Sequence, residues 1–144
     1  MKVDRLYHSN AILLQNGTVM TAGSNPAREC NEHRIEIFSP PYLAHATRPE
    51  IKEYPEKVKY NETITIKTAS TETIKTVSLI KPSATTHCLN PEQRYVGLEF
   101  AQSSYNIKTR IPDNRNVLPP GFYMLFITNE NDTPCIAPFV QVLM

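Results

Sequence analysis

Three side chains that can bind a metal ion stand at two distant places in the sequence. Tyr7 and His8 are neighbours near the start of the chain, and His87 lies at the tip of a polar stretch, residues 85–94, between two apolar runs. Two imidazoles and a phenol would form a metal site if the fold brought them together. A single histidine is more often a hydrogen-bonded surface or core group, so the elements that position these residues decide between the interpretations.

The composition argues against several classes of function. The 144 residues suffice for one domain with a sizeable core and at most a fragment of a second. Charged residues make up 20% of the chain and the formal net charge is +1, so the basic field that nucleic acid binding requires is missing. The longest apolar run, residues 122–127, is too short to cross a bilayer, and the first residues lack the apolar segment of a signal peptide. We expect no nucleic acid partner and no membrane partner.

The residue pattern predicts an all-β chain with almost no helix. Twelve prolines occur, and no window is rich in alanine, glutamate, lysine and leucine. Apolar runs at residues 11–14 and 19–22 flank Asn16-Gly17, which is the strongest short signal for a β-hairpin, and residues 34–38 alternate as a third strand. Because so small a sheet is marginal alone in water, we expect residues 1–43 to belong to a larger sheet.

From about residue 46 onward, short candidate strands at regular spacing are typical of a two-layer antiparallel sandwich. Seven strands are expected, at residues 50–53, 63–67, 76–80, 95–100, 105–109, 121–129 and 137–143. The residues that would face the core alternate along these strands. They are Ile64, Ile66, Val77, Leu79, Val96, Leu98, Phe100, Tyr123, Leu125 and Ile127. The sequence therefore predicts two parts, residues 1–45 and residues 46–144.

Other motifs carry less information. The chain shows no Ser/His/Asp order, no His-Glu-x-x-His helix and no glycine-rich phosphate loop, so hydrolase and nucleotide-binding functions have little support. The three cysteines are Cys30, Cys88 and Cys135, which allow at most one internal disulfide. They show no Cys-x-x-Cys spacing, so no structural zinc site is indicated. Three glycosylation sequons fit a secreted protein without establishing it, and they begin at Asn16, Asn61 and Asn131.

Several ordered motifs resemble one enzyme family. Residues 5–9, 13–19, 23–26 and 36–43 resemble the end of the catalytic propeller in the copper radical oxidases galactose oxidase and glyoxal oxidase. Residues 86–94, Pro112 and residues 119–126 are similar to the C-terminal domain of the same enzymes. The resemblance runs essentially end to end. It implies an immunoglobulin-like (E-set) antiparallel β-sandwich, residues 46–144, preceded by the terminal strands of an incomplete kelch-type β-propeller, residues 1–45.

The resemblance also implies a copper site. In this family one copper ion is bound by two histidines and two tyrosines, and an arm of the C-terminal domain carries one histidine into the propeller. Carried over to this chain, Tyr7 is the axial ligand, and His8 and His87 are the equatorial ligands, a set that suits Cu(II). The family oxidises primary alcohols or aldehydes with O2 and forms hydrogen peroxide. Tyr7 would accept the substrate hydroxyl proton. The pKa of a free phenol is about 10, so that role requires a nearby cation, such as copper, that favours the phenolate form.

The same resemblance places part of the machinery outside this chain. The family's second tyrosine ligand, crosslinked to a cysteine as the radical cofactor, lies upstream in the propeller, and no cysteine here matches it by context. We therefore expect this chain to be the C-terminal portion of a secreted oxidase, without a signal peptide of its own. We expect it to be inactive alone and to need the N-terminal propeller as its partner. One alternative is a non-catalytic immunoglobulin-like module for packing or recognition that no longer binds copper. An independent copper or zinc binder has less support.

Three geometric expectations follow for the site. Adjacent side chains of a regular strand point to opposite faces, with Tyr7 inward and His8 outward, so the two converge only at a bulge or a strand end. Cys88 is expected to be a small buried group, although a thiolate beside His87 could favour Cu(I). Without a propeller to enter, the arm should hold His87 loosely and apart from Tyr7 and His8, unless the chain keeps the geometry of the longer protein.

Overall fold

The structure, a computed structural model, describes residues 2–25, 32–44 and 47–144. Within these residues the chain forms twelve strands in three sheets and one short 3-10 helix, Pro41–Ala44. The all-β prediction is confirmed. None of the helical structure among the described residues is long and apolar enough to cross a membrane.

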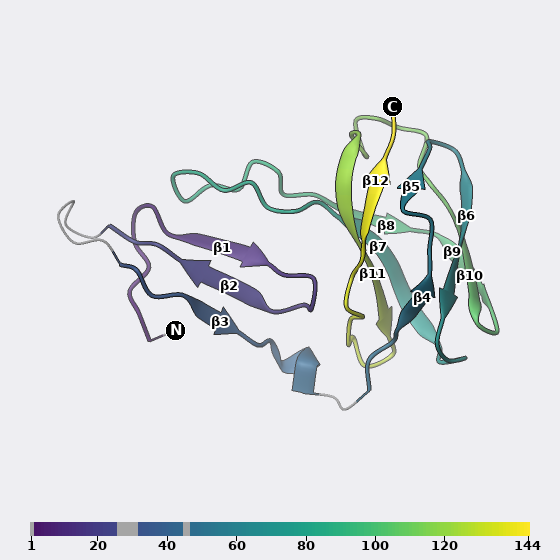
Figure 1. Ribbon diagram of the computed structural model, residues 1–144, viewed down its shortest axis with the longest axis horizontal. Coiled ribbons are helices and arrows are strands. Elements are labelled where there is room, and N and C mark those ends of the chain that lie inside the picture. The colour runs from purple at the N-terminus through teal and green to yellow at the C-terminus, as the bar shows by residue number, and fades with distance from the viewer. Residues whose placement is uncertain (1, 26–31, 45–46) are drawn as a thin grey trace.

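The three sheets divide along the chain (Figure 1). The first is a three-stranded sheet of β1 (Asn10–Leu13), β2 (Val19–Ala22) and β3 (Glu36–Phe38). The second, in the order β4-β6-β10-β9, contains β4 (Ile51–Glu53), β6 (Thr63–Thr68), β9 (Phe100–Ser103) and β10 (Asn106–Arg110). The third, in the order β5-β12-β11-β7-β8, contains β5 (Lys57–Val58), β7 (Ile74–Ile80), β8 (Tyr95–Leu98), β11 (Gly121–Asn129) and β12 (Phe139–Val142). The second and third sheets form the sandwich.

The predicted hairpin is present, with a loop longer than a two-residue turn. β1 and β2 are antiparallel, with Leu13 opposite Val19. Beyond this pair, the Leu14 N–H donates to the Thr18 carbonyl and the Gly17 N–H donates to the Leu14 carbonyl, each at 2.9 Å. Gly17 has a φ of 81°, as in a turn that ends on a left-handed glycine. The predicted third strand is shorter than expected and begins at residue 36.

The sandwich has nine strands within the described residues instead of the predicted seven. The expected strand at residues 95–100 is two strands, because β8 pairs with β7 in one sheet and β9 pairs with β10 in the other. The chain crosses between the sheets at Glu99. The unpredicted β5 pairs parallel with β12, so the sandwich is antiparallel except at this pair. A strand of two residues has no periodicity that a sequence pattern could reveal.

The predicted core stripes are buried in the sandwich. Nine of the ten named residues are at most 6% exposed, and Phe100, which lies on the far side of the crossover, is half-buried. β11 also buries Met124 and Phe126, whose side chains alternate with the inward stripe. Its outer face is therefore covered as well, by the hairpin loop and its neighbours, and Leu13 packs against the core from that side.

Hydrogen bonds attach the hairpin loop to the sandwich. The Ala137 N–H donates to the Gln15 carbonyl at 2.9 Å, and the Gln15 side-chain amide donates to the Ala137 carbonyl at 2.8 Å. The Arg48 guanidinium donates at 2.7 to 3.0 Å to the carbonyl oxygens of Asn16, Pro134 and Cys135. These bonds fix the three-stranded sheet where it extends away from the sandwich (Figure 1).

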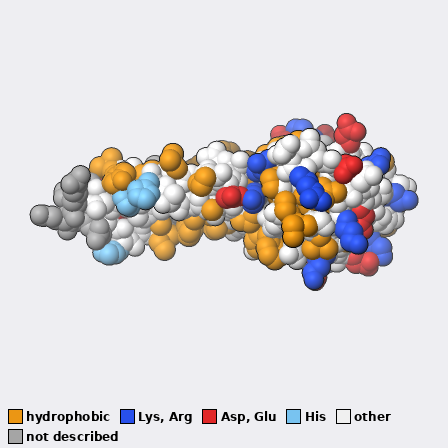
Figure 2. All heavy atoms as spheres, turned by 90° about the horizontal axis from the view of Figure 1, so that it is seen from above, with side chains coloured by type: hydrophobic (Ala, Val, Ile, Leu, Met, Phe, Trp, Pro, Cys, Tyr) orange, Lys and Arg blue, Asp and Glu red, His pale blue; other side chains and the backbone are white. Residues whose placement is uncertain are grey.

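Charged and apolar side chains are distributed unevenly over the molecule. In the view of Figure 2, lysine, arginine and acidic side chains gather over the sandwich, whereas the histidine atoms lie toward the other end beside hydrophobic side chains. On this face, the part of the molecule around the histidines thus shows few charged side chains, with hydrophobic side chains scattered among other atoms (Figure 2).

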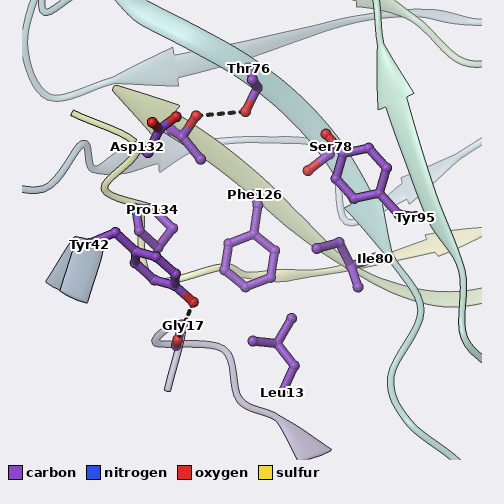
Figure 3. Close-up of a pocket in the computed structure, with 11 residues that line it drawn as sticks. Leu13, Gly17, Tyr42, Thr76, Ser78, Ile80, Tyr95, Phe126, Asp132 and Pro134 are labelled. Atoms are coloured by element: carbon purple, nitrogen blue, oxygen red, sulfur yellow. Dashed lines mark hydrogen bonds between the residues drawn. The ribbon is translucent and has the colours of Figure 1, made fainter. Parts of the chain in front are cut away.

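A pocket of about 350 Å³ lies between the hairpin and the outer face of the five-stranded sheet (Figure 3). The Phe126 ring points into it, and at its edge the Tyr42 hydroxyl donates to the Gly17 carbonyl at 2.9 Å. The Thr76 and Thr128 hydroxyls bond to each other at 2.6 Å. Three of its hydroxyl groups thus have partners within the lining, and none of the lining residues belongs to residues 5–9 or 84–90. We interpret it as a gap between packed elements.

Candidate metal centre

The structure brings Tyr7, His8 and His87 together. The ring centres are 4.1 Å apart for Tyr7 and His8, 5.0 Å for His8 and His87, and 6.3 Å for Tyr7 and His87. His87 arrives on the arm, residues 81–94, which connects β7 to β8 and runs from the sandwich past β1 (Figure 1). The expectation that His87 lies apart from the other two is wrong, and its stated alternative, a retained geometry, describes what is seen.

Tyr7 and His8 lie in a turn that precedes β1. The Ser9 N–H donates to the Leu6 carbonyl at 3.0 Å, and His8 has a φ of 64°, as at the third position of a type II turn. The Asn25 N–H donates to the Tyr7 carbonyl at 2.7 Å. Both side chains are exposed, Tyr7 to 57%. The pair therefore converges at a strand end, and the alternative in which Tyr7 packs inward is wrong.

The end of β2 supports this turn from behind. The Leu6 N–H donates to the Ser24 hydroxyl at 3.0 Å. Gly23 approaches so closely that a Cβ at this position would stand 2.5 Å from the His8 carbonyl oxygen. From the sequence, residues 23–26 were expected only to end the hairpin and to be part of a family motif, so this contact was not predicted. A glycine directly after a predicted strand was the available signal.

Gly23→Ala is expected to displace the turn that carries Tyr7 and His8. The added Cβ would meet backbone, which cannot rotate away, and the φ of 73° at Gly23 is unfavourable for alanine. We expect the free energy of unfolding to fall by about 1 to 3 kcal/mol, with shifted ring signals of both residues in nuclear magnetic resonance (NMR) spectra. Gly97→Ala is the matched control, because its Cβ would meet only the Tyr95 ring at an ordinary 3.6 Å. Unmoved ring signals in Gly23→Ala would contradict the prediction.

Arg5 links this turn to the rest of the three-stranded sheet. Its guanidinium donates to the Gly23 carbonyl at 2.7 Å, to the Arg34 carbonyl at 2.9 Å and to the Glu36 carboxylate at 3.3 Å. The Lys2 N–H also donates to Glu36, at 2.6 Å. The Lys2 N–H and then Arg5 lower the pKa of Glu36, so this carboxylate stays charged and keeps Arg5 in place.

His87 lies at the tip of a tight hairpin within the arm. Thr86 and Leu89 exchange both backbone hydrogen bonds, at 2.8 and 2.7 Å. The two residues between them, His87 and Cys88, have φ values of 49° and 67°. Positive φ at both central positions is the signature of a type I′ turn, which usually contains Asn-Gly. His-Cys gives no such signal, so the sequence predicted only a polar loop here.

His8 and His87 thus share an uncommon backbone conformation. Only a few per cent of non-glycine residues adopt positive φ, and such strain tends to cluster at functional sites. Here two histidines from distant parts of the chain are among the seven described non-glycine residues with positive φ, and their ring centres lie 5.0 Å apart with the ring planes tilted by 57°. The short distance between the two rings, more than the backbone conformation, supports a functional role for the pair.

The two neighbours of His87 make further contacts. The Thr86 hydroxyl oxygen lies 2.8 Å from His87 Nδ1. The Cys88 thiol points at the Leu6 carbonyl, 3.5 Å away, and so joins the arm tip weakly to the turn at Tyr7. Cys88 is exposed, so the expectation of a small buried group is wrong. Cys135, by contrast, is buried in the sandwich, and burial raises the pKa of its thiol to about 11. Cys30 lies outside the described residues.

Polar side chains brace the arm near its middle. Asn90 Oδ1 accepts from the Ala84 N–H at 3.1 Å and from the Glu92 N–H at 3.2 Å, while its amide donates to the Ser83 hydroxyl at 3.1 Å. Lys81 forms an ion pair with Glu92. Apart from the local bond between Glu92 and Asn90, these interactions cross between the two sides of the arm and hold it extended toward the turn at Tyr7.

The donor set fits a copper ion bound in part by this chain. Imidazole nitrogens bind such ions at about 2 Å, so two imidazoles on one ion have ring centres roughly 4.5 to 6 Å apart. The observed 5.0 Å between His8 and His87 agrees. Among the described residues no group of three or more His, Cys, Asp or Glu side chains could hold a metal ion, so the phenol of Tyr7 is the third donor at hand.

Comparisons with known proteins agree with the resemblance found in the sequence. A family model for the galactose oxidase-like, early set domain matches residues 48–142. Galactose oxidase of Gibberella zeae is 34% identical over 147 residues, which cover 96% of this chain and 21% of that protein. The aldehyde oxidase GLOX of Vitis pseudoreticulata is 35% identical over 160 residues, which cover 98% of this chain and 30% of that protein.

A solved structure supports the same relationship. A fungal alcohol oxidase of the AA5 family, in complex with copper, matches with a TM-score of 0.90 and 32% identity, over 100% of this chain and 32% of the other. The chain thus spans about a fifth to a third of the length of the relatives that it matches. On the family match and the shared fold, the chain belongs to the galactose oxidase-like early set domain family.

Proposed function

We propose that this chain is the C-terminal portion of a copper radical oxidase that oxidises primary alcohols or aldehydes with O2 and forms hydrogen peroxide. The observation that carries the proposal is the convergence of Tyr7, His8 and His87 from two separate segments. Relatives named galactose oxidase and aldehyde oxidase, and a copper-bound alcohol oxidase structure, support it. In this proposal residues 1–45 end a propeller, and residues 46–144 form the following domain.

The three residues have distinct roles in this proposal. His8 and His87 bind copper through imidazole nitrogens, and Tyr7 binds it through the phenol oxygen. Copper, when bound, supplies one of the two electron transfers of alcohol oxidation and favours the phenolate form of Tyr7. Tyr7 Oη then accepts the proton of the substrate hydroxyl. The tyrosine–cysteine radical cofactor, which would supply the other electron transfer, is assigned to a propeller outside this sequence. The chain alone is then inactive.

Exposed apolar side chains support the propeller as a partner. Ile37 and Phe38 are neighbours on β3, so they point to opposite faces of the three-stranded sheet, and each is 54% exposed. Leu6, beside the candidate metal centre, is 52% exposed. Apolar surface of this kind marks interaction sites. The neighbouring blades of a propeller would cover it. The sequons at Asn61 and Asn131, both exposed, suit a secreted protein.

The proposal is tested by joining this chain to a propeller that carries the tyrosine–cysteine pair, such as that of the Gibberella galactose oxidase. The joined protein is expected to bind Cu(II), seen by electron paramagnetic resonance, and to release hydrogen peroxide from primary alcohols or aldehydes in the presence of O2. The same propeller without this chain is the control. A folded joined protein that binds no copper would favour the non-catalytic module instead.

A further inference from the structure

We propose that Thr86 is a positioning residue that selects which nitrogen of His87 meets a metal ion. Its hydroxyl engages Nδ1, so that Nε2 alone is presented. The inference rests on the proposed function, because it takes His87 as a copper ligand, and it adds a role to a residue that does not bind the ion itself.

The geometry begins with a hydroxyl whose position is set by the backbone. Thr86 exchanges two backbone hydrogen bonds with Leu89, at 2.8 and 2.7 Å, so the residue is held at the first position of the type I′ turn. Its hydroxyl oxygen then stands 2.8 Å from His87 Nδ1, within ordinary hydrogen-bond distance. The ring of the adjacent residue is thereby turned with Nδ1 toward the arm.

The chemistry of imidazole converts this contact into a choice of nitrogen. A neutral imidazole has one N–H donor and one lone pair, and only the lone pair can bind a metal ion. An ion cannot reach Nδ1 while the Thr86 hydroxyl occupies that position. It can reach Nε2, and Nδ1 then keeps its proton and donates a hydrogen bond to Thr86 Oγ1. Hydrogen bonds of this kind fix both the tautomer and the ring orientation of metal-binding histidines.

The choice of nitrogen at His87 matters because the same ion must also reach the other two candidate donors, Tyr7 and His8. His8 presents its ring from a turn whose backbone is held by Gly23 and Asn25, and the Tyr7 ring packs edge-on against it at 4.1 Å. Both come from the turn that precedes β1, whereas His87 comes from the arm. A His87 ring that rotated to offer Nδ1 would move its lone pair relative to these donors, so one ion could no longer satisfy all three.

The experiment compares Thr86→Val with the wild-type chain, using Cu(II) for affinity and the diamagnetic ion Zn(II) for NMR. Valine keeps the branched shape of threonine and removes the hydroxyl. We expect Cu(II) affinity to fall about 10-fold, the lower part of the range for losing such a partner, because this site is exposed. In nitrogen-15 spectra with Zn(II), wild-type His87 should be ligated through Nε2 only, and Thr86→Val should show both nitrogens ligated. Thr86→Ser should restore the wild-type behaviour, and Thr85→Val should leave it unchanged.

The outcomes separate the two ideas. If Thr86→Val binds Cu(II) as tightly as wild type and still uses Nε2 only, the positioning role is overturned and the proposed function stands. If the wild-type chain takes up neither ion at His8 and His87, the ligand assignment itself fails, and the role of Thr86 fails with it. A loss of affinity that Thr86→Ser does not restore would assign the effect to the turn and not to the hydroxyl.

Discussion

Replacing His87 with alanine is expected to weaken Cu(II) binding more than about 100-fold. Losing a residue that only orients a ligand costs about 10- to 100-fold, so losing the ligand should exceed that range. No other imidazole lies on the arm, whose neighbouring residues at the tip are Thr86, Cys88 and Leu89. Competition with a coloured chelator measures the affinity, and electron paramagnetic resonance follows the loss of a nitrogen ligand. The measurement applies both to this chain and to the protein joined to a propeller.

The controls for this prediction use other residues of the same chain. His33→Ala removes an exposed imidazole between β2 and β3 and should leave copper affinity unchanged. Cys88→Ser removes the only sulfur of the arm, and because thiolates prefer Cu(I), it should not weaken Cu(II) binding as His87→Ala does. Unfolding in urea should be nearly the same for all variants, since these side chains are exposed. Copper binding of His87→Ala at the wild-type level would show that the ligand assignment is wrong.

The strands of the sandwich could be predicted where the alternation of apolar and polar residues within a single strand revealed them. Alternation at Ile64 and Ile66, or at Val77 and Leu79, marks a strand with one buried face, and these residues are buried. The crossover at Glu99 escaped the sequence analysis because alternation continues unbroken when a strand leaves one sheet for the other. Both faces of β11 are buried for a tertiary reason, the docked hairpin loop, which no local pattern reports.

The candidate site was predictable in its residues but less so in its geometry. The residue types of Tyr7, His8 and His87, together with the family motifs around them, predicted a metal site. The structure brings the three rings together. Their convergence depends on positive φ at His8 and His87, which lack the glycine or asparagine that normally signals such turns. Contacts between residues 82 apart, such as Cys88 with Leu6, also have no signature in a single sequence. The arm was expected to lie apart because no propeller is present to receive it, unless the geometry of the longer protein is kept, and the short ring distances agree with the retained geometry.

Replacing Tyr7 with phenylalanine is expected to have the largest effect on catalysis. In the protein joined to a propeller, turnover of a primary alcohol should fall by about 10²- to 10⁴-fold, the usual contribution of a positioned acid or base. Phenylalanine keeps the ring that packs edge-on against His8 at 4.1 Å and removes only the hydroxyl that would accept the substrate proton. Hydrogen peroxide formation, followed by a coupled peroxidase assay, measures the loss.

The Tyr7→Phe result also separates the two roles given to the phenol. If the copper signal persists while turnover collapses, Tyr7 acts chiefly as the proton acceptor, and both imidazoles still hold the ion. If the copper is lost as well, the phenol oxygen is needed as a ligand. Tyr105→Phe changes a tyrosine between β9 and β10 that is 50% exposed, compared with 57% for Tyr7, and it should retain full turnover. Wild-type turnover in Tyr7→Phe would remove Tyr7 from the mechanism and leave His8 and His87 as a two-imidazole copper site whose base must come from the propeller.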